Sequence, residues 1–131
     1  MNLNDSKICF IGAGNMTKSI VSGLVNNAYP AHLITASNPS VEKLTALQAD
    51  CGINITQDNN QALNTADVIV LAVKPQLMQQ VCAKLAQENN LQNKLFISIA
   101  AGISTTRLQQ MLGGVTRRLL SKTNVPLFMV S

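Results

Sequence analysis

The stretch ICFIGAGNMT, residues 8–17, constrains the fold of this chain more than any other. An apolar run stops abruptly at two glycines spaced one residue apart, Gly12 and Gly14. After them, apolar residues recur at helical spacing: Met16, Ile20, Val21, Leu24 and Val25. The pattern predicts a strand over residues 7–12 that is buried on both faces, then a tight turn and a helix over residues 15–26.

The alternation of strand and helix continues along the chain. Short apolar runs predict strands over residues 32–37, 67–73 and 95–102, and a weaker one over residues 53–55. A helix is expected over residues 76–88, and others follow from the capping residues described next. Strands that alternate with helices are typical of a parallel sheet covered on both faces. The predicted fold class is therefore α/β, a Rossmann-type doubly wound parallel sheet in a single domain.

Four residues indicate where helices begin or end. Pro39 is expected in the first turn of a helix whose apolar stripe is Val41, Leu44, Leu47 and Cys51, and Gly52 is expected as its left-handed cap. Asp58 and Ser104 can each cap the helix that follows. We expect residues 1–114 to form the dinucleotide-binding domain, and residues 115–131 to form a divergent tail with one last strand around residues 118–121.

Composition narrows the classes of function. Apolar residues make up 47% and charged residues 12%, as in a globular protein, and no apolar run nears the ~20 residues of a membrane helix. The net charge of +4 comes from scattered basic residues with few aromatics, which argues against nucleic-acid binding and suits anionic small molecules.

The three cysteines, Cys9, Cys51 and Cys82, form no CxxC pair, so we predict no metal site and no disulfide framework. Cys9 and Cys82 lie in apolar stretches and are expected to be buried thiols. Because the first residues, MNLNDSK, do not resemble a secretory leader, a reducing cytoplasm is the expected compartment.

The glycine turn predicts a site for a diphosphate. A parallel strand that opens a helix through GxGxx brings backbone amides and the positive end of a helix dipole to one point. Gly12 would permit the tight turn, and Gly14 would let the phosphates approach the backbone. Thr17 stands where the fingerprint has a third glycine, so it is expected to face outward a little or to push the helix back.

The end of the second predicted strand indicates the choice of cofactor. An acidic residue there usually binds the adenosine ribose of NAD, but TASNPS contains no carboxylate before Glu42. Ser37, Asn38 and Ser40 can donate hydrogen bonds to a 2′-phosphate without repelling it. We therefore predict NADP, with NADPH preferred and NADH possible; alternatively, NPS is only a helix cap.

Two further strand ends, AVKP (residues 72–75) and IAAG (residues 99–102), consist of small residues punctuated by proline or glycine. Ligands of such sheets lie beyond the carboxyl ends of the strands, so these segments suit backbone passing beneath a flat ring. Turns without ligands can look alike. Lys74 is the only cation at either end, and it either faces the ligand or is a solvated lysine at a helix start.

Four stretches, FIGAGNM, TASNPS, LAVKPQ and SIAAGIS, occur in an order and at spacings that resemble the N-terminal half of the pyrroline-5-carboxylate reductase family, over residues 7–113. The resemblance implies a Rossmann domain whose NADPH or NADH passes hydride to the C=N carbon of 1-pyrroline-5-carboxylate, giving L-proline. It also implies a homo-oligomer. The implied cofactor contacts are Ile11, Gly12, Ala13, Gly14, Asn15, Met16, Ser37, Asn38, Asn59, Ala72, Val73, Lys74, Pro75, Ala100, Ala101 and Gly102.

The chain departs from this family after the last predicted helix. The family continues with a segment like RxMPNxP and then a helical domain that dimerises and supplies the substrate pocket. Here the stretch reads LLSKTNVPLFMVS, in which Asn124 and Pro126 correspond to the NxP, while the arginine, the methionine and the first proline are missing. The dimerising domain is therefore expected to be absent, and no catalytic residue is assigned. The alternatives are an inactive NADP-binding module and a different NADP-dependent imine or hydroxyacid reductase.

Overall fold

The computed structural model describes residues 6–91, 94–100, 102–113 and 118–121. In these residues six parallel strands form one sheet in the order β3-β2-β1-β4-β5-β6. The strands are β1 (Ile8–Ile11), β2 (Ile34–Ser37), β3 (Asn54–Thr56), β4 (Val68–Leu71), β5 (Leu95–Ser98) and β6 (Arg118–Ser121). The Rossmann-type fold predicted from the alternation is confirmed, and β6 lies where a last strand was expected.

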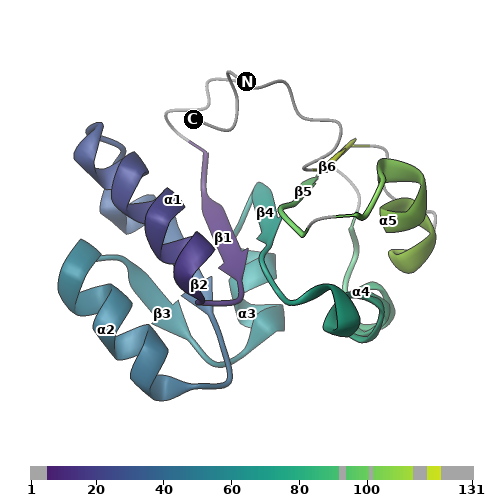
Figure 1. Ribbon diagram of the computed structural model, residues 1–131, viewed down its shortest axis with the longest axis horizontal. Helices are drawn as coiled ribbons and strands as arrows, with labels where there is room; N and C mark the ends of the chain where they lie inside the picture. Colours follow the sequence, from purple (N-terminus) through teal and green to yellow (C-terminus); the bar gives the residue numbers. More distant parts are fainter. Residues whose placement is uncertain (1–5, 92–93, 101, 114–117, 122–131) are drawn as a thin grey trace.

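Five α-helices connect these strands and cover both faces of the sheet (Figure 1). They are α1 (Asn15–Asn26), α2 (Val41–Cys51), α3 (Asn59–Asn64), α4 (Pro75–Glu88) and α5 (Thr105–Met111). Buried residues of α1 and α2 share one core cluster, and those of α3, α4 and α5 share the other. The two clusters lie on opposite faces of the sheet, since neighbouring strand residues such as Cys9 and Phe10 fall in different clusters.

The two faces of β5 are covered unequally. Phe96 and Ser98 are fully buried, and Phe96 belongs to the cluster that α4 and α5 cover. On the other face Leu95 and Ile97 are only partly buried, as is Ile99 just beyond the strand. This difference follows from the connections, because the helices after β4 and β5 pack on the face opposite to α1 and α2.

The capping residues expected from the sequence lie where they were predicted, with one exception. The side chain of Asp58 accepts from the amides of Asn60 and Gln61, and that of Ser104 accepts from Arg107. Gly52 ends α2 in the left-handed conformation, with φ of 74°. Pro39 was expected inside the first turn of α2, but Ser40 is the N-cap, so Pro39 lies outside the helix.

Other sequence predictions need correction. Met16 and Val41 were placed on apolar stripes, but they are 50% and 54% exposed because, at the starts of their helices, they lie outside the core cluster that Val21 and Leu44 join. The strand expected from residue 32 begins only at Ile34, since residues 31–33 form a 3-10 turn after Pro30. The weak strand is β3, one residue later than expected.

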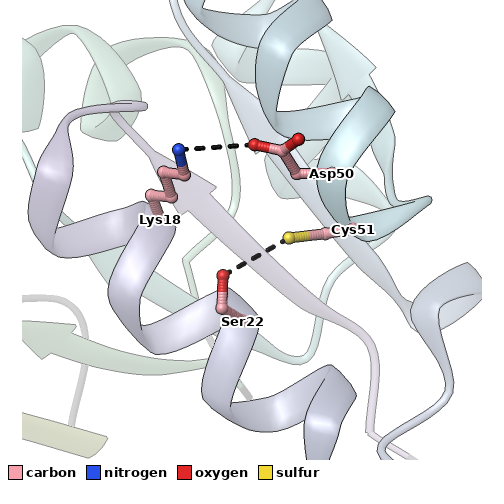
Figure 2. A network of polar contacts seen from close by, with 4 residues as sticks. All are labelled: Lys18, Ser22, Asp50 and Cys51. Carbon is pink, nitrogen blue, oxygen red and sulfur yellow. Dashed lines mark hydrogen bonds and ion pairs between the residues drawn. The ribbon is translucent and has the colours of Figure 1, made fainter.

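Polar contacts join α1 to α2 at the surface (Figure 2). Lys18 forms an ion pair with Asp50 at 3.3 Å, and the Ser22 hydroxyl lies 3.6 Å from the Cys51 sulfur. Both charged side chains are more than half exposed, so the ion pair contributes less than about 1 kcal/mol. The packing of Val21 and Leu47, which are buried, therefore stabilises this pair of helices more.

All three cysteines are free and buried, which confirms the prediction for Cys9 and Cys82. Burial raises the pKa of the Cys82 thiol to about 12. Burial likewise raises the pKa of Cys9 to about 12, although the positive charge of Lys94 opposes this increase. Both thiols are therefore protonated and unreactive in the folded protein near neutral pH. No helix in the described ranges is long and apolar enough to cross a membrane.

Candidate functional site

The candidate site lies at the edge of the sheet where the parallel strands end. Strand order reverses between β1 and β4, which are neighbours in the sheet and lead into helices on opposite faces. In doubly wound sheets the usual ligand position is beyond the strand ends at such a reversal, where the two loops lead to opposite faces. The β1–α1 and β4–α4 turns meet at this point, because the Ala72 amide donates to the Ile11 carbonyl oxygen at 2.8 Å.

The two helices that begin at this point have no side-chain cap. α1 starts after Gly14 and α4 after Lys74, and neither cap residue accepts a hydrogen bond through its side chain. Neither first turn contains an acidic residue. The other three α-helices of the described chain are each capped by a side chain. The uncapped start of α1 therefore leaves amide donors and a partial positive charge available to an anion. At α4 fewer donors remain, because Pro75 has no amide hydrogen and the Leu77 amide donates to the Lys74 carbonyl oxygen at 2.9 Å.

Gly12 and Gly14 have different structural roles. Gly12 has a φ of 115°, and a β-carbon there would lie 2.7 Å from the carbonyl oxygen of Ala72. Only glycine therefore fits between the two turns. Gly14 has an ordinary extended backbone, with φ of −82° and ψ of −168°, and a β-carbon there would meet nothing within 4 Å. The space in front of Gly14 fits a ligand that approaches the backbone.

Thr17 does not face outward, contrary to the first of the two outcomes expected for it. Its side chain is fully buried, and its hydroxyl donates to the Gly12 carbonyl oxygen at 2.9 Å. The hydroxyl thus satisfies a turn carbonyl that would otherwise be buried without a side-chain partner. The sequence pattern drew attention to the volume of Thr17, but no spacing rule indicated the hydrogen bond.

The end of β2 is hydrogen-bonded to the glycine turn and to α3. Ser37 is fully buried; its hydroxyl donates to Oδ1 of Asn59 at 2.6 Å, and its carbonyl oxygen accepts from Gly12 at 2.8 Å. The side-chain oxygen of Asn38 accepts from the amide of Ala13 at 3.2 Å. These contacts bring together three segments that the sequence placed at the site separately.

The remaining predicted residues line the same edge of the sheet. Asn15 and Met16 are exposed in the first turn of α1, whereas the Ile11 side chain is buried in the core. Lys74 and Pro75 are exposed at the start of α4, after the partly buried Ala72 and Val73. Beyond β5, Ala100 is buried and Gly102 is exposed with φ of 81°. Ala101 lies outside the described residues.

Sequence reasoning missed one link in this site. Gln57 follows β3, and its side-chain amide donates to the Pro39 carbonyl oxygen at 2.9 Å, across 18 residues of sequence. The backbone amide of Asn38 also donates to the Thr56 carbonyl oxygen, at 3.3 Å. The loops after β2 and β3 are therefore joined, and only a known strand order could have indicated it. In the described ranges no group of three His, Cys, Asp or Glu side chains could hold a metal ion.

Comparison with known proteins defines the class of this fold and site. Residues 7–102 match the family model described as "NADP oxidoreductase coenzyme F420-dependent". The match covers most of the chain and includes the glycine turn, the end of β2 and the β4–α4 and β5–α5 turns. The chain belongs to this family of NADP oxidoreductases.

Within this class, the chain is similar to the N-terminal part of pyrroline-5-carboxylate reductases, as its motifs predicted. It is 51% identical to the enzyme of that name from Vibrio alginolyticus over 124 residues, which is 95% of this chain and 45% of the relative. A solved pyrroline-5-carboxylate reductase from Coxiella burnetii superposes with a TM-score of 0.79 at 39% identity, covering 88% of this chain and 43% of the other. The chain thus spans about half the length of these relatives.

A third relative bears on the cofactor. The crystal structure of Plasmodium falciparum pyrroline carboxylate reductase was solved with NADP bound. It superposes with a TM-score of 0.70 at 26% identity, covering 85% of this chain and 39% of that one. An NAD(P)-type cofactor is in keeping with the family.

Proposed function

We propose that this chain is the cofactor-binding part of a pyrroline-5-carboxylate reductase, which reduces 1-pyrroline-5-carboxylate to L-proline with NADPH. One observation carries the proposal: the two uncapped helices of the described chain, α1 and α4, both begin at the reversal of strand order. The proposal is supported by the similarity of nearly the whole chain to the named relatives. The substrate is proposed from the names of those relatives alone.

The proposed cofactor contacts lie at or after the ends of five strands, β1 to β5. The first-turn amides of α1 after Gly14 would hold the diphosphate, and Ser37, Asn38 and Asn59 would form the adenosine side. The turns at residues 72–75 and 100–102 would flank the nicotinamide ring. The bound cofactor would supply the hydride for the C=N carbon of the substrate. The chain itself would hold the ring at the sheet edge, since positioning the two reactants supplies much of the catalytic gain.

We propose NADPH over NADH because the adenosine side contains no carboxylate. Ser37 and Asn38 are both uncharged, and the hydroxyl of Ser37 is already bonded to Asn59. This leaves the amide group of Asn38 as the side chain of this pair best placed to donate to a 2′-phosphate. Replacing Asn38 by Asp places a negative charge there and should shift the preference toward NADH. An undiminished NADPH preference in N38D would contradict this placement.

Assembly and compartment are also proposals. A homo-oligomer is proposed from the resemblance to the reductase family, which dimerises through a domain that this chain's match does not include. The cytoplasm is proposed because all three cysteines are free and buried.

Thermal unfolding of the full chain with and without cofactor tests the binding step. A ligand that binds only the folded state stabilises it by mass action, so NADPH at 100 times its Kd should stabilise the protein by about 2.7 kcal/mol. A clear rise in Tm with NADPH is the expected result. No shift with either NADPH or NADH at millimolar concentration would overturn the cofactor proposal.

A second assay tests the chemistry separately. NADPH oxidation is followed at fixed protein concentration, with and without 1-pyrroline-5-carboxylate. Oxidation that depends on the imine supports the reductase. Cofactor binding without such oxidation supports the alternative, a nucleotide-binding module without catalysis. Oxidation with other imines or with oxo acids, but not with pyrroline carboxylate, would identify a different reductase.

A further inference from the structure

Asn38 has a second contact that a role at the 2′-phosphate does not explain. Its side-chain oxygen faces back into the fold and accepts from the amide of Ala13 at 3.2 Å. Ala13 lies between the two glycines of the turn, 25 residues earlier in the chain. Because the backbone amide can only donate, the oxygen of the Asn38 amide must face it, and the NH2 group then points elsewhere.

Three polar groups of the turn are already paired within the fold. The Gly12 amide donates to the Ser37 carbonyl oxygen, and the Gly12 carbonyl oxygen accepts from the Thr17 hydroxyl. The Ala13 amide donates to the side-chain oxygen of Asn38. The described part of the chain offers no side-chain cap to the amides that follow Gly14. The inner donors are thus occupied, and those left for an anion begin at the N-terminus of α1.

The bond adds to the contacts that hold the buried Ala13, next to the exposed Gly14. Gly14 has no β-carbon contact within 4 Å, and its peptide links the fixed Gly12 to a helix start without a cap. Asn38 is itself held in place, since its backbone amide donates to the Thr56 carbonyl oxygen at 3.3 Å. The orientation of the turn is therefore set by the loop after β2, which is half-buried at this point.

We propose that Asn38 is a positioning residue for the diphosphate turn, acting through the Ala13 amide in addition to any contact with the adenosine end. This rests on the proposed cofactor function. It predicts that loss of the Asn38 oxygen weakens NADPH and NADH alike. A role limited to the 2′-phosphate predicts weaker NADPH and unchanged NADH, because NADH has no group at that position.

The test compares Asn38→Ala with Asn54→Ala, both measured by titration with NADPH and with NADH. Asn54 is a matched control, since its side chain also bonds backbone across strands, to His32 and Ile34, but at the opposite end of β2. We expect N38A to lower the NADH affinity by about 2- to 12-fold, the range for one neutral hydrogen bond. The NADPH affinity should fall by at least as much, because that loss also includes the contact proposed between Asn38 and the 2′-phosphate. N54A should lower Tm and leave both affinities as in the wild type.

Amide hydrogen exchange at Ala13 in the cofactor-free protein reports on the bond to Asn38 without any contribution from cofactor contacts. In the cofactor-free protein, exchange at Ala13 should be faster in N38A than in the wild type. It should stay slow in N38D, which retains an acceptor, and in N54A. Unchanged exchange in N38A, or a loss confined to NADPH affinity, would overturn the positioning role while leaving the proposed function intact. If the wild type binds neither cofactor, both proposals fail.

Discussion

The position of a β-carbon on Gly12 lies 2.7 Å from the carbonyl oxygen of Ala72, closer than real β-carbons approach any heavy atom. Ala72 follows β4, so this contact sets how closely the β1–α1 turn packs against the β4–α4 turn. These two turns belong to the candidate site, and their close packing depends on the absence of one methyl group at Gly12.

Gly12→Ala should destabilise the protein strongly. A positive φ costs a non-glycine residue about 1–3 kcal/mol, and overpacking against backbone adds about 1–3 kcal/mol. Urea unfolding should therefore show a loss of at least about 2 kcal/mol. Gly23→Ala is the matched control, because Gly23 is an exposed position inside α1 and a β-carbon there meets nothing within 4 Å. It should stabilise the protein by about 0.5–1 kcal/mol, and similar losses in both variants would contradict the packing argument.

Gly14→Val should separate folding from binding. The extended backbone at Gly14 suits any residue, and no neighbour lies within 4 Å of a β-carbon. We expect the free energy of unfolding to change by less than about 1 kcal/mol, since only the N-cap preference is affected. The rise in Tm with NADPH should disappear, because the side chain occupies the approach to the α1 amides. A wild-type shift in this variant would mean that the nucleotide binds elsewhere.

Thr17→Val should reveal the value of the buried hydroxyl. Valine has nearly the same shape but leaves the Gly12 carbonyl oxygen without its donor. A buried unsatisfied group costs about 1–3 kcal/mol, which denaturant unfolding can resolve. Thr17→Ser retains the donor and should recover most of that loss. Equal stability of the valine and wild-type proteins would show that the bond contributes little.

Stability should fall as the pH rises above 9, partly because of the two buried thiols. The pKa of Cys82 is about 12 in the folded protein, raised from an ordinary value of 9.0, so the unfolded chain loses this proton first. Fewer protons are then bound by the unfolded state, and the free energy of unfolding decreases between pH 9 and 12. In Cys82→Ala the decrease should be shallower by at most about 1.4 kcal/mol per pH unit. Parallel curves between pH 8 and 10.5 would contradict this.

Much of the fold could be predicted because it depends on local periodicity. The runs that became β1 and β4 are continuous and apolar, as is typical of strands buried on both faces. Asp58 and Ser104 cap helices through neighbours two or three residues away. Burial at helix starts was harder to predict. Met16 and Val41 continue an apolar stripe in sequence, but they lie at the starts of their helices and outside the core cluster on that face of the sheet.

The candidate site was predictable where a motif is contiguous and not where it is assembled. GAG at residues 12–14 indicated the turn directly. The bonds from Ala13 to Asn38 and from Gln57 to Pro39 join residues 25 and 18 positions apart, so they depend on the order of strands in the sheet. The spacing of residues along the sequence does not indicate the order of strands in the sheet.

Thr17 also bears on how such chains are found. A search pattern that admits only glycine or alanine at the third fingerprint position treats that place as a limit on size and passes over this sequence. The hydrogen bond from the Thr17 hydroxyl to the Gly12 carbonyl oxygen shows that this position accepts a larger residue that bonds to the turn, as well as a small one. A pattern that also admits threonine and serine there would recover chains of this kind, at the expense of more false matches to be removed by the strand and helix context.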